Sequence, residues 1–196
     1  MGVTPALWRA ADDPRAAHDL CEALVEEPRY LHTRGVAQRA ARAAALVRLP
    51  ADERRRLLAA AWLHDVGYGL LGTGYHPVDG ARALRQAGHE PLARLVAHHS
   101  GAAARARLLG LPDVTAEFPV PAGPDRGLLD LLDVADLLSG SAGEPITPVQ
   151  RLQRMVERKG ADSPSVRMLV QNVDRLGAQD DTRRLIEILA GDGAPA

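Results

Sequence analysis

Histidine and aspartate are the residue types through which this chain is best equipped to do chemistry. Imidazole and carboxylate groups are the usual protein ligands of zinc, iron, manganese and related metals. A metal site requires that several of them converge in the folded chain. The seven histidines available are His18, His32, His64, His76, His89, His98 and His99.

His64 and Asp65 stand at the end of a predicted helix with an apolar face. Ala61 lies three residues before His64, and Trp62 lies three before Asp65, so both side chains continue the apolar stripe. A buried aspartate is costly unless it is paired or bound to a metal. Taken alone, however, the pair is explained somewhat better as a helix-terminal histidine beside a solvated aspartate.

His32 and Asp136 each interrupt an otherwise apolar helix face. His32 shares its face with Val36 and Ala40, and Asp136 lies in the strongly apolar stretch 131–138. The simpler alternatives are a hydrogen-bonded core histidine and a solvated acidic face. An acid within such an apolar helix nevertheless needs a partner.

The remaining candidates are His76, His98 and His99. His76 directly precedes Pro77, in a loop before a predicted helix, and such histidines are exposed about as often as not. His99 follows Leu95 by four residues and extends the apolar stripe of its helix, whereas His98 lies near the edge of that stripe. The periodicity favours His99 without deciding between the two.

Apolar spacing, prolines and glycines divide the chain into helices joined by loops. An alanine- and arginine-rich chain with few β-branched runs favours helix over strand, so the predicted fold class is all-α. The predicted loops cover 66–76, 110–125 and 140–148. The predicted helices cover 14–26, 29–48, 52–65, 77–88, 91–99, 126–139, 148–159, 164–176 and 180–190.

Composition narrows the class of protein further. The 196 residues are 46% hydrophobic, enough for one domain with a sizeable core. With 24 basic and 25 acidic residues the net charge is −1, which argues against a dedicated nucleic-acid surface. Cys21 is the only cysteine, which fits a reducing cytoplasm. No apolar run approaches the roughly 20 residues that cross a membrane.

Taken in chain order, the candidates resemble the HD superfamily of metal-dependent phosphohydrolases. Its pattern is H…HD…D, often with two further histidines before the last aspartate. Residues 62–67 (WLHDVG) are similar to the family's LLHDIG segment, residues 76–81 (HPVDGA) to the H-x-x-x-G-A segment of its bimetal subfamily, and residues 134–137 (VADL) to its xADxL helix. The resemblance covers about residues 25–140. Actinobacterial HD-domain proteins share stretches like 96–102 and 135–143, which indicates a class of chemistry and no substrate.

The resemblance implies that the site binds one or two divalent transition-metal ions, which could be Mn, Fe, Zn, Ni or Co. Asp65 would bridge the ions and orient or deprotonate the nucleophile, and His76 is a second catalytic candidate. The first ion would be held by His32, His64, Asp65 and Asp136; the second would be held by Asp65, His76 and either His98 or His99.

One position departs from the family pattern. Many members carry a lysine three residues after the HD aspartate, and this chain has Tyr68 there. Tyr68 and Arg34 are therefore the candidates for substrate binding. Further positive charge is available from Arg39, Arg82 and Arg85.

The implied function is hydrolysis of a phosphoester or phosphoanhydride bond in a small phosphorylated metabolite or nucleotide. Two alternatives remain. The same ligand set serves HD-type di-iron oxygenases, an alternative that Tyr68 slightly favours. A non-catalytic regulatory module that binds metal or nucleotide is less favoured, because such modules usually lose ligands.

The expected organisation is a single HD-domain helical bundle with extra C-terminal helices. We expect a loose arm over 1–13, the HD domain over 14–140, helices packed on the same domain over 141–190, and a disordered tail over 191–196. The C-terminal helices have two other interpretations, as a homodimer interface or as a cover over the site. Packing on the same core is the favoured one.

Overall fold

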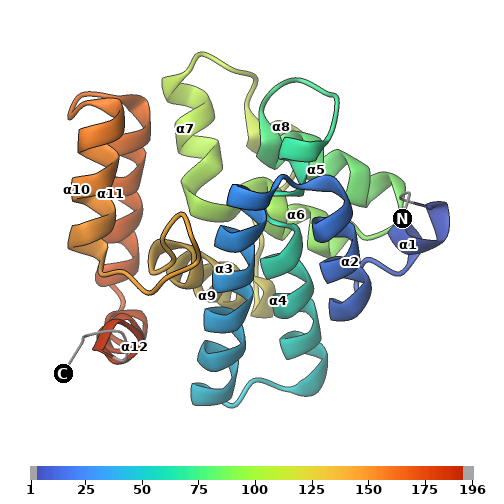
Figure 1. Cartoon of the computed structure of the whole chain (residues 1–196), viewed down its shortest axis with the longest axis horizontal. Coiled ribbons are helices and arrows are strands. Elements are labelled where there is room, and N and C mark those ends of the chain that lie inside the picture. Colours follow the sequence, from blue (N-terminus) through green and yellow to red (C-terminus); the bar gives the residue numbers. More distant parts are fainter. Residues whose placement is uncertain (1–3, 192–196) are drawn as a thin grey trace.

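The computed structural model describes residues 4–191, and regular structure in this part of the chain is helical (Figure 1). Its described residues contain no strand, only an isolated bridge between Ser139 and Pro145. The predicted all-α class is therefore confirmed. The predicted tail lies outside the described residues, except for Gly191. Within 4–191, none of the helices is both long and apolar enough to cross a membrane.

The predicted helices agree closely with those of the structure, but Ala102–Leu108 and Val114–Glu117 are helices that were not predicted, and the second lies within the predicted loop 110–125. Many helices carry a proline in the first turn, where its missing N–H costs nothing. The first half contains α1 (Pro5–Arg9), α2 (Pro14–Leu24), α3 (Glu27–Leu46), α4 (Ala51–Leu63), the 3-10 helix η1 (Val66–Gly69), α5 (His76–Gln86), α6 (Glu90–His98) and the 3-10 helix η2 (His99–Gly101). The second half contains α7 (Ala102–Leu108), α8 (Val114–Glu117), α9 (Pro124–Leu137), α10 (Pro148–Lys159), α11 (Pro164–Gly177) and α12 (Asp180–Gly191).

The prediction of a loose arm over 1–13 needs correction, because Pro5–Arg9 form helix α1. Thr4 caps this helix by accepting a hydrogen bond from the backbone N–H of Leu7. Leu7 and Trp8 pack against the main core. A helix of five residues is too short to give a periodic signal, which is why the sequence pattern did not reveal it.

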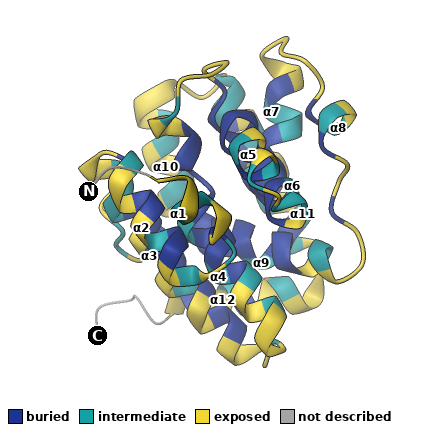
Figure 2. Ribbon diagram, turned by 90° about the vertical axis from the view of Figure 1, so that its right-hand side faces the viewer, coloured by how far each residue is buried: buried dark blue, intermediate teal, exposed yellow. Residues whose placement is uncertain are grey.

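The main core is built from alanine and leucine. Helix α4 lies within it, and its Ala59, Ala60, Ala61 and Leu63 are fully buried. Buried residues gather between α4, α5, α6 and α9 (Figure 2). Small side chains allow short distances between helix axes, so the ends of several helices meet near the carboxyl end of α4.

The C-terminal helices pack on the same body. Figure 1 shows α10 and α11 side by side at one end of the molecule, with α12 below them. A second apolar cluster joins α11 and α12 to α9 and to the last turns of α3. Its buried members are Ala43, Val134, Leu137, Leu138, Leu169, Leu176, Leu185 and Leu189.

A close backbone approach ties the loop after α9 to α3. Gly35 faces Gly143, and a Cβ at Gly35 would lie 2.4 Å from the carbonyl oxygen of Gly143. Arg39 holds the two segments together by donating hydrogen bonds to both carbonyl oxygens. The same loop brings the carbonyl of Gly140 to His32, so the approach also positions a candidate site residue.

Gly35→Ala is expected to destabilise the fold by about 1–3 kcal/mol, because the added methyl group overlaps the backbone of Gly143. Gly127→Ala is the matched control, since Gly127 is exposed in α9 and a Cβ there meets nothing within 4 Å. The control is expected to stabilise by about 1 kcal/mol. Urea unfolding followed by circular dichroism measures both changes, and equal effects at the two positions would contradict the packing described.

Candidate metal centre

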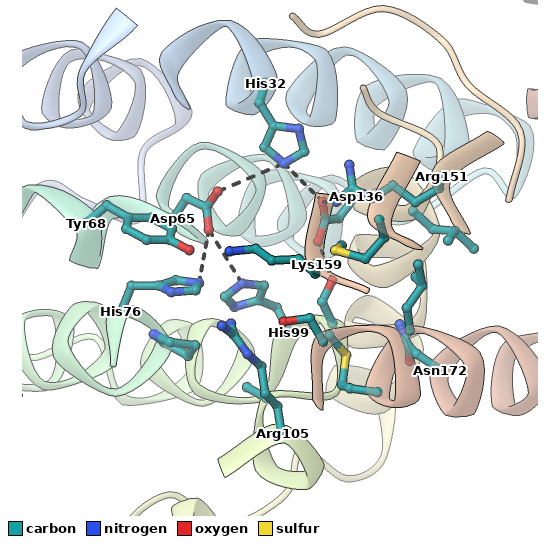
Figure 3. A pocket seen from close by; sticks show the side chains of 18 of the residues that line it. His32, Asp65, Tyr68, His76, His99, Arg105, Asp136, Arg151, Lys159 and Asn172 are labelled. Carbon is teal, nitrogen blue, oxygen red and sulfur yellow. Dashed lines mark hydrogen bonds and ion pairs between the residues drawn. The ribbon is translucent and has the colours of Figure 1, made fainter. Parts of the chain in front are cut away.

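Four histidines surround the carboxylate of Asp65, and each of its oxygens faces two of them. Figure 3 shows three of the four, His32, His76 and His99. Oδ2 lies 3.4 Å from Nε2 of His64 and 3.9 Å from Nε2 of His32. Oδ1 lies 3.2 Å from Nε2 of His76 and 3.8 Å from Nε2 of His99. The carboxylate thus stands between two histidine pairs.

These side chains form two overlapping groups with metal-ligand geometry. One group is His32, His64 and Asp65, and the other is Asp65, His76 and His99. Within each group the candidate ligand atoms lie within 4.8 Å of one another, and all five residues are buried. Two groups that share one carboxylate have the donor arrangement of a bridged two-metal site.

The ligand-bearing segments come from four parts of the fold. His32 projects from α3, His64 and Asp65 follow the last turn of α4, and His76 is the first residue of α5. His76 was expected in the loop before this helix. His99 follows α6, where the chain turns sharply because Ser100 adopts positive φ.

This turn separates His98 from His99. His99 belongs to the cluster around Asp65. His98 points elsewhere, and its Nε2 donates a hydrogen bond of 2.7 Å to the carbonyl oxygen of Phe118. Of the two alternatives left open by the sequence, the structure brings His99 to the site and gives His98 a place in the packing around Phe118.

Gly67 allows the approach of α5 to the histidine–aspartate pair. A Cβ at Gly67 would lie 2.0 Å from the carbonyl oxygen of His76 and 2.8 Å from the backbone nitrogen of Gly80. Any side chain here would push α5 away. The glycine two residues after Asp65 therefore keeps His76 within reach of the carboxylate.

The imidazoles are oriented for ligation through Nε2. The Nδ1 atoms of His32, His64 and His99 lie 3.0, 2.8 and 2.7 Å from backbone carbonyl oxygens. A neutral imidazole that donates from Nδ1 keeps its lone pair on Nε2. Nε2 of His64 is buried and makes no hydrogen bond of good geometry, only the 3.4 Å ion pair with Asp65. A metal ion between these two atoms would bind both. The donor set fits a divalent transition metal.

Asp136 lies beside the first group, on α9. Its Oδ1 is 3.0 Å from Nε2 of His32 and accepts a hydrogen bond of 3.1 Å from Arg151. Its Oδ2 accepts a hydrogen bond from the hydroxyl of Ser100. The predicted role of Asp136 at the first metal is thus compatible with its position next to His32.

The pKa values of His64 and His99 are shifted in opposite directions by burial and by neighbouring charges. Burial disfavours charge on Asp65, but His64 and His76 outweigh burial and hold the pKa of this carboxyl well below its usual range. Burial also opposes charge on His64, yet Asp65 raises the pKa of His64 to about 9. Burial, and then the charges of His64 and His76, lower the pKa of His99 to about 3. Without metal, His64 carries a proton that His99 does not.

Tyr68 lies at the site, and Arg29 accompanies it. The Tyr68 ring stacks on His76 with centroids 4.0 Å apart, and the Arg29 guanidinium lies 4.5 Å from its centroid. Arg29 also donates a hydrogen bond of 3.0 Å to Asp65. Sequence reasoning missed Arg29, although its position three residues before His32 places it on the same helix face.

The other predicted sources of positive charge lie away from the site. Arg34 is exposed and does not line the cavity in front of the histidines. Arg39 is used in the loop contact to α3. Arg82 pairs with Glu117 at 2.7 Å, and Arg85 pairs with Glu90 at 2.6 Å. These arginines stabilise the fold or face solvent.

A cavity of about 270 Å³ opens in front of the histidines. Helices α10 and α11 form one wall of it, so the C-terminal helices partly cover the site (Figure 3). A larger groove of about 840 Å³ adjoins the cavity and shares Arg29, Tyr68 and Arg151 with it. The cations that line the cavity are Arg29, Arg105, Arg151, Arg158 and Lys159.

All five cations lie outside the segments that carry the sequence motifs. On an amphipathic helix such as α10, a charged residue that faces a cavity follows the same spacing as one that faces solvent. Only the tertiary arrangement distinguishes them.

The family model described as the HD domain matches residues 29–178 of this chain. The match covers most of the sequence, and the chain therefore belongs to the HD domain family. The match extends beyond residue 140 and includes the whole of α10 and α11. No match was found among curated proteins or solved structures.

In the metal-free protein we expect His64 to be protonated at pH 7 and to lose its proton near pH 9. Its folded pKa exceeds the unfolded value of about 6.5. The pairing with Asp65 therefore stabilises the fold fully below pH 6.5, and this contribution is lost as the pH rises through 9.

Imidazole nitrogen chemical shifts of the 15N-labelled, metal-free protein measure this protonation directly. The resonances are assigned with His64→Gln and His99→Gln variants, and His99 is expected to be neutral from pH 5 upward. A neutral His64 at pH 7, or a protonated His99, would contradict the charge distribution.

Proposed function

We propose that this chain is a metal-dependent phosphohydrolase that cleaves a phosphoester or phosphoanhydride bond in a small phosphorylated metabolite or nucleotide. The observation that carries the proposal is a carboxylate shared by two histidine groups at the floor of a cavity lined by cations. Membership of the HD domain family, mostly metal-dependent hydrolases, supports it.

One or two divalent transition-metal ions (Mn, Fe, Zn, Ni or Co) would lower the pKa of a bound water and polarise a phosphoryl oxygen. We propose that the first group holds one ion together with Asp136, and that the second group holds the other. The proposed ligands are His32, His64, Asp65 and Asp136 for the first, and Asp65, His76 and His99 for the second.

The side chains of this chain would divide the remaining work. Asp65 would orient the attacking water and accept its proton. His76 has the most exposed side chain of the four histidines, at 10%, and lines the cavity, where it can donate a proton to the leaving oxygen when it is not a ligand. Arg29, held against Asp65 and Tyr68, presents positive charge to the phosphoryl group.

The di-iron oxygenase alternative uses the same ligands. The five cations of the cavity favour an anionic substrate under either chemistry, so the products of the reaction must distinguish the two. The regulatory alternative is disfavoured because the donor set is complete.

We further propose a cytoplasmic location and a small-molecule partner. Cys21 is buried, and burial raises its pKa to about 12, so it stays a protonated thiol and suits a reducing compartment. A net charge of −1 favours a small substrate over nucleic acid. The homodimer stays a prediction.

Incubation of the purified protein with each candidate metal and a panel of phosphoesters and phosphoanhydrides is expected to release inorganic phosphate. Asp65→Asn is expected to lower the rate by about 10²–10⁴-fold, because it removes a base and a ligand. Asp162→Asn, at an exposed position, is the matched control and keeps the rate. Oxygen uptake by iron-loaded protein, with no phosphate released from any compound, would contradict the hydrolase and favour the oxygenase.

A further inference from the structure

The cavity wall carries more positive charge than its own carboxylates neutralise. Arg29 is paired with Asp65, and Arg151 with Asp136, at 3.0 and 3.1 Å. The other three lining cations have no carboxylate partner among the described residues 4–191. They are Arg105, Arg158 and Lys159.

Of the three, Arg105 has the strongest need for a hydrogen-bond acceptor. It is partly buried on α7, and its Nε atom is buried without a hydrogen-bond partner. A buried donor that lacks an acceptor costs roughly 1–3 kcal/mol. An oxygen of an anionic ligand in the cavity would satisfy this donor.

Arg158 and Lys159 end α10 on the opposite wall. Arg158 is exposed, and its side chain makes one hydrogen bond with the described residues, a weak one of 3.8 Å to the sulfur of Met155. The side chain of Lys159 has neither a hydrogen bond nor an ion pair with any described residue, and Figure 3 shows it extending into the cavity. It is also the only lysine in the sequence.

A single phosphoryl group does not account for these cations. The metal centre and Arg29 already face the reacting phosphoryl group, which carries at most two negative charges. Three further cations line the same cavity, with Arg105 partly buried and Arg158 and Lys159 exposed at the end of α10, so the cavity attracts additional negative charge. Guanidinium groups bind phosphate through paired hydrogen bonds, and lysine binds it as a point charge.

We propose that Arg105, Arg158 and Lys159 form a subsite for a second anionic group, so that the substrate is a diphosphate or a bisphosphorylated molecule rather than a monophosphate. The inference rests on the proposed function for the reacting group, but the subsite itself consists of residues outside the metal ligands. The adjoining groove, with Leu24 and Ile146 in its wall, offers space for the organic part of the substrate.

Because Lys159 is the only lysine, it is the only side chain that an amine-directed reagent acylates. The rate of its acylation therefore reports on this subsite. Metal-free protein is treated with an N-hydroxysuccinimide acetate ester, and acetylation of Lys159 is followed by peptide mass spectrometry. Pyrophosphate at ten times its Kd is expected to slow acetylation about tenfold, by simple occupancy. Orthophosphate at the same concentration is expected to protect far less.

Variants test the assignment of the cations. Arg105→Gln and Arg158→Gln are expected to weaken the protection, whereas Arg167→Gln, an exposed cation of α11 outside the cavity, leaves it intact. In calorimetry, Lys159→Gln is expected to raise the Kd for pyrophosphate about three- to tenfold. Lys159→Arg is expected to restore the affinity, because it restores the charge.

The outcomes separate this inference from the proposed function. Equal labelling with and without pyrophosphate, or equal protection by the two anions, would overturn the subsite even if the protein hydrolyses monophosphates. Protection by pyrophosphate in a protein that hydrolyses nothing would support the subsite and overturn the hydrolase.

Discussion

The burial of one carboxylate constrains this structure more than any other feature. A charged aspartate removed from water costs several kcal/mol unless its surroundings compensate. Asp65 is 3% exposed, and four imidazoles and the Arg29 guanidinium surround it. Because these groups come from α3, α4, α5 and the end of α6, the carboxylate can be buried only when all four segments meet. The alanine-rich core and Gly67 allow that meeting.

The C-terminal helices serve both the fold and the site. Helices α11 and α12 cover the apolar face of α9, the helix that carries Asp136. Helix α10, which packs beside α11, supplies Arg151 to Asp136 and places Lys159 at the cavity. A change that loosened the packing of α11 would therefore also alter the charge around the metal centre. The family match ends at residue 178, so it includes α10 and α11 and stops before α12.

Local sequence signals identified most of the helices, and the resemblance to the HD superfamily identified the residues that converge. Proline starts and apolar periodicity mark helices, and burial of His32, Asp65 and Asp136 follows from their place on apolar faces. The choice of His99 over His98 follows the same periodicity, although the turn at Ser100 settles their directions. The cations of the cavity could not be predicted in this way. Their role depends on how distant helices pack, which no local spacing encodes, and Arg34 was favoured while Arg29 was missed.

The most direct test of the account is elemental analysis of the protein purified with excess metal, beside single variants of the shared carboxylate and of each histidine group. If Asp65 joins two sites, the wild-type chain binds two ions, His64→Ala and His76→Ala each bind fewer, and Asp65→Asn binds almost none. A wild-type chain that binds one ion, lost in His64→Ala but kept in both His76→Ala and His99→Ala, would contradict the bridging role of Asp65.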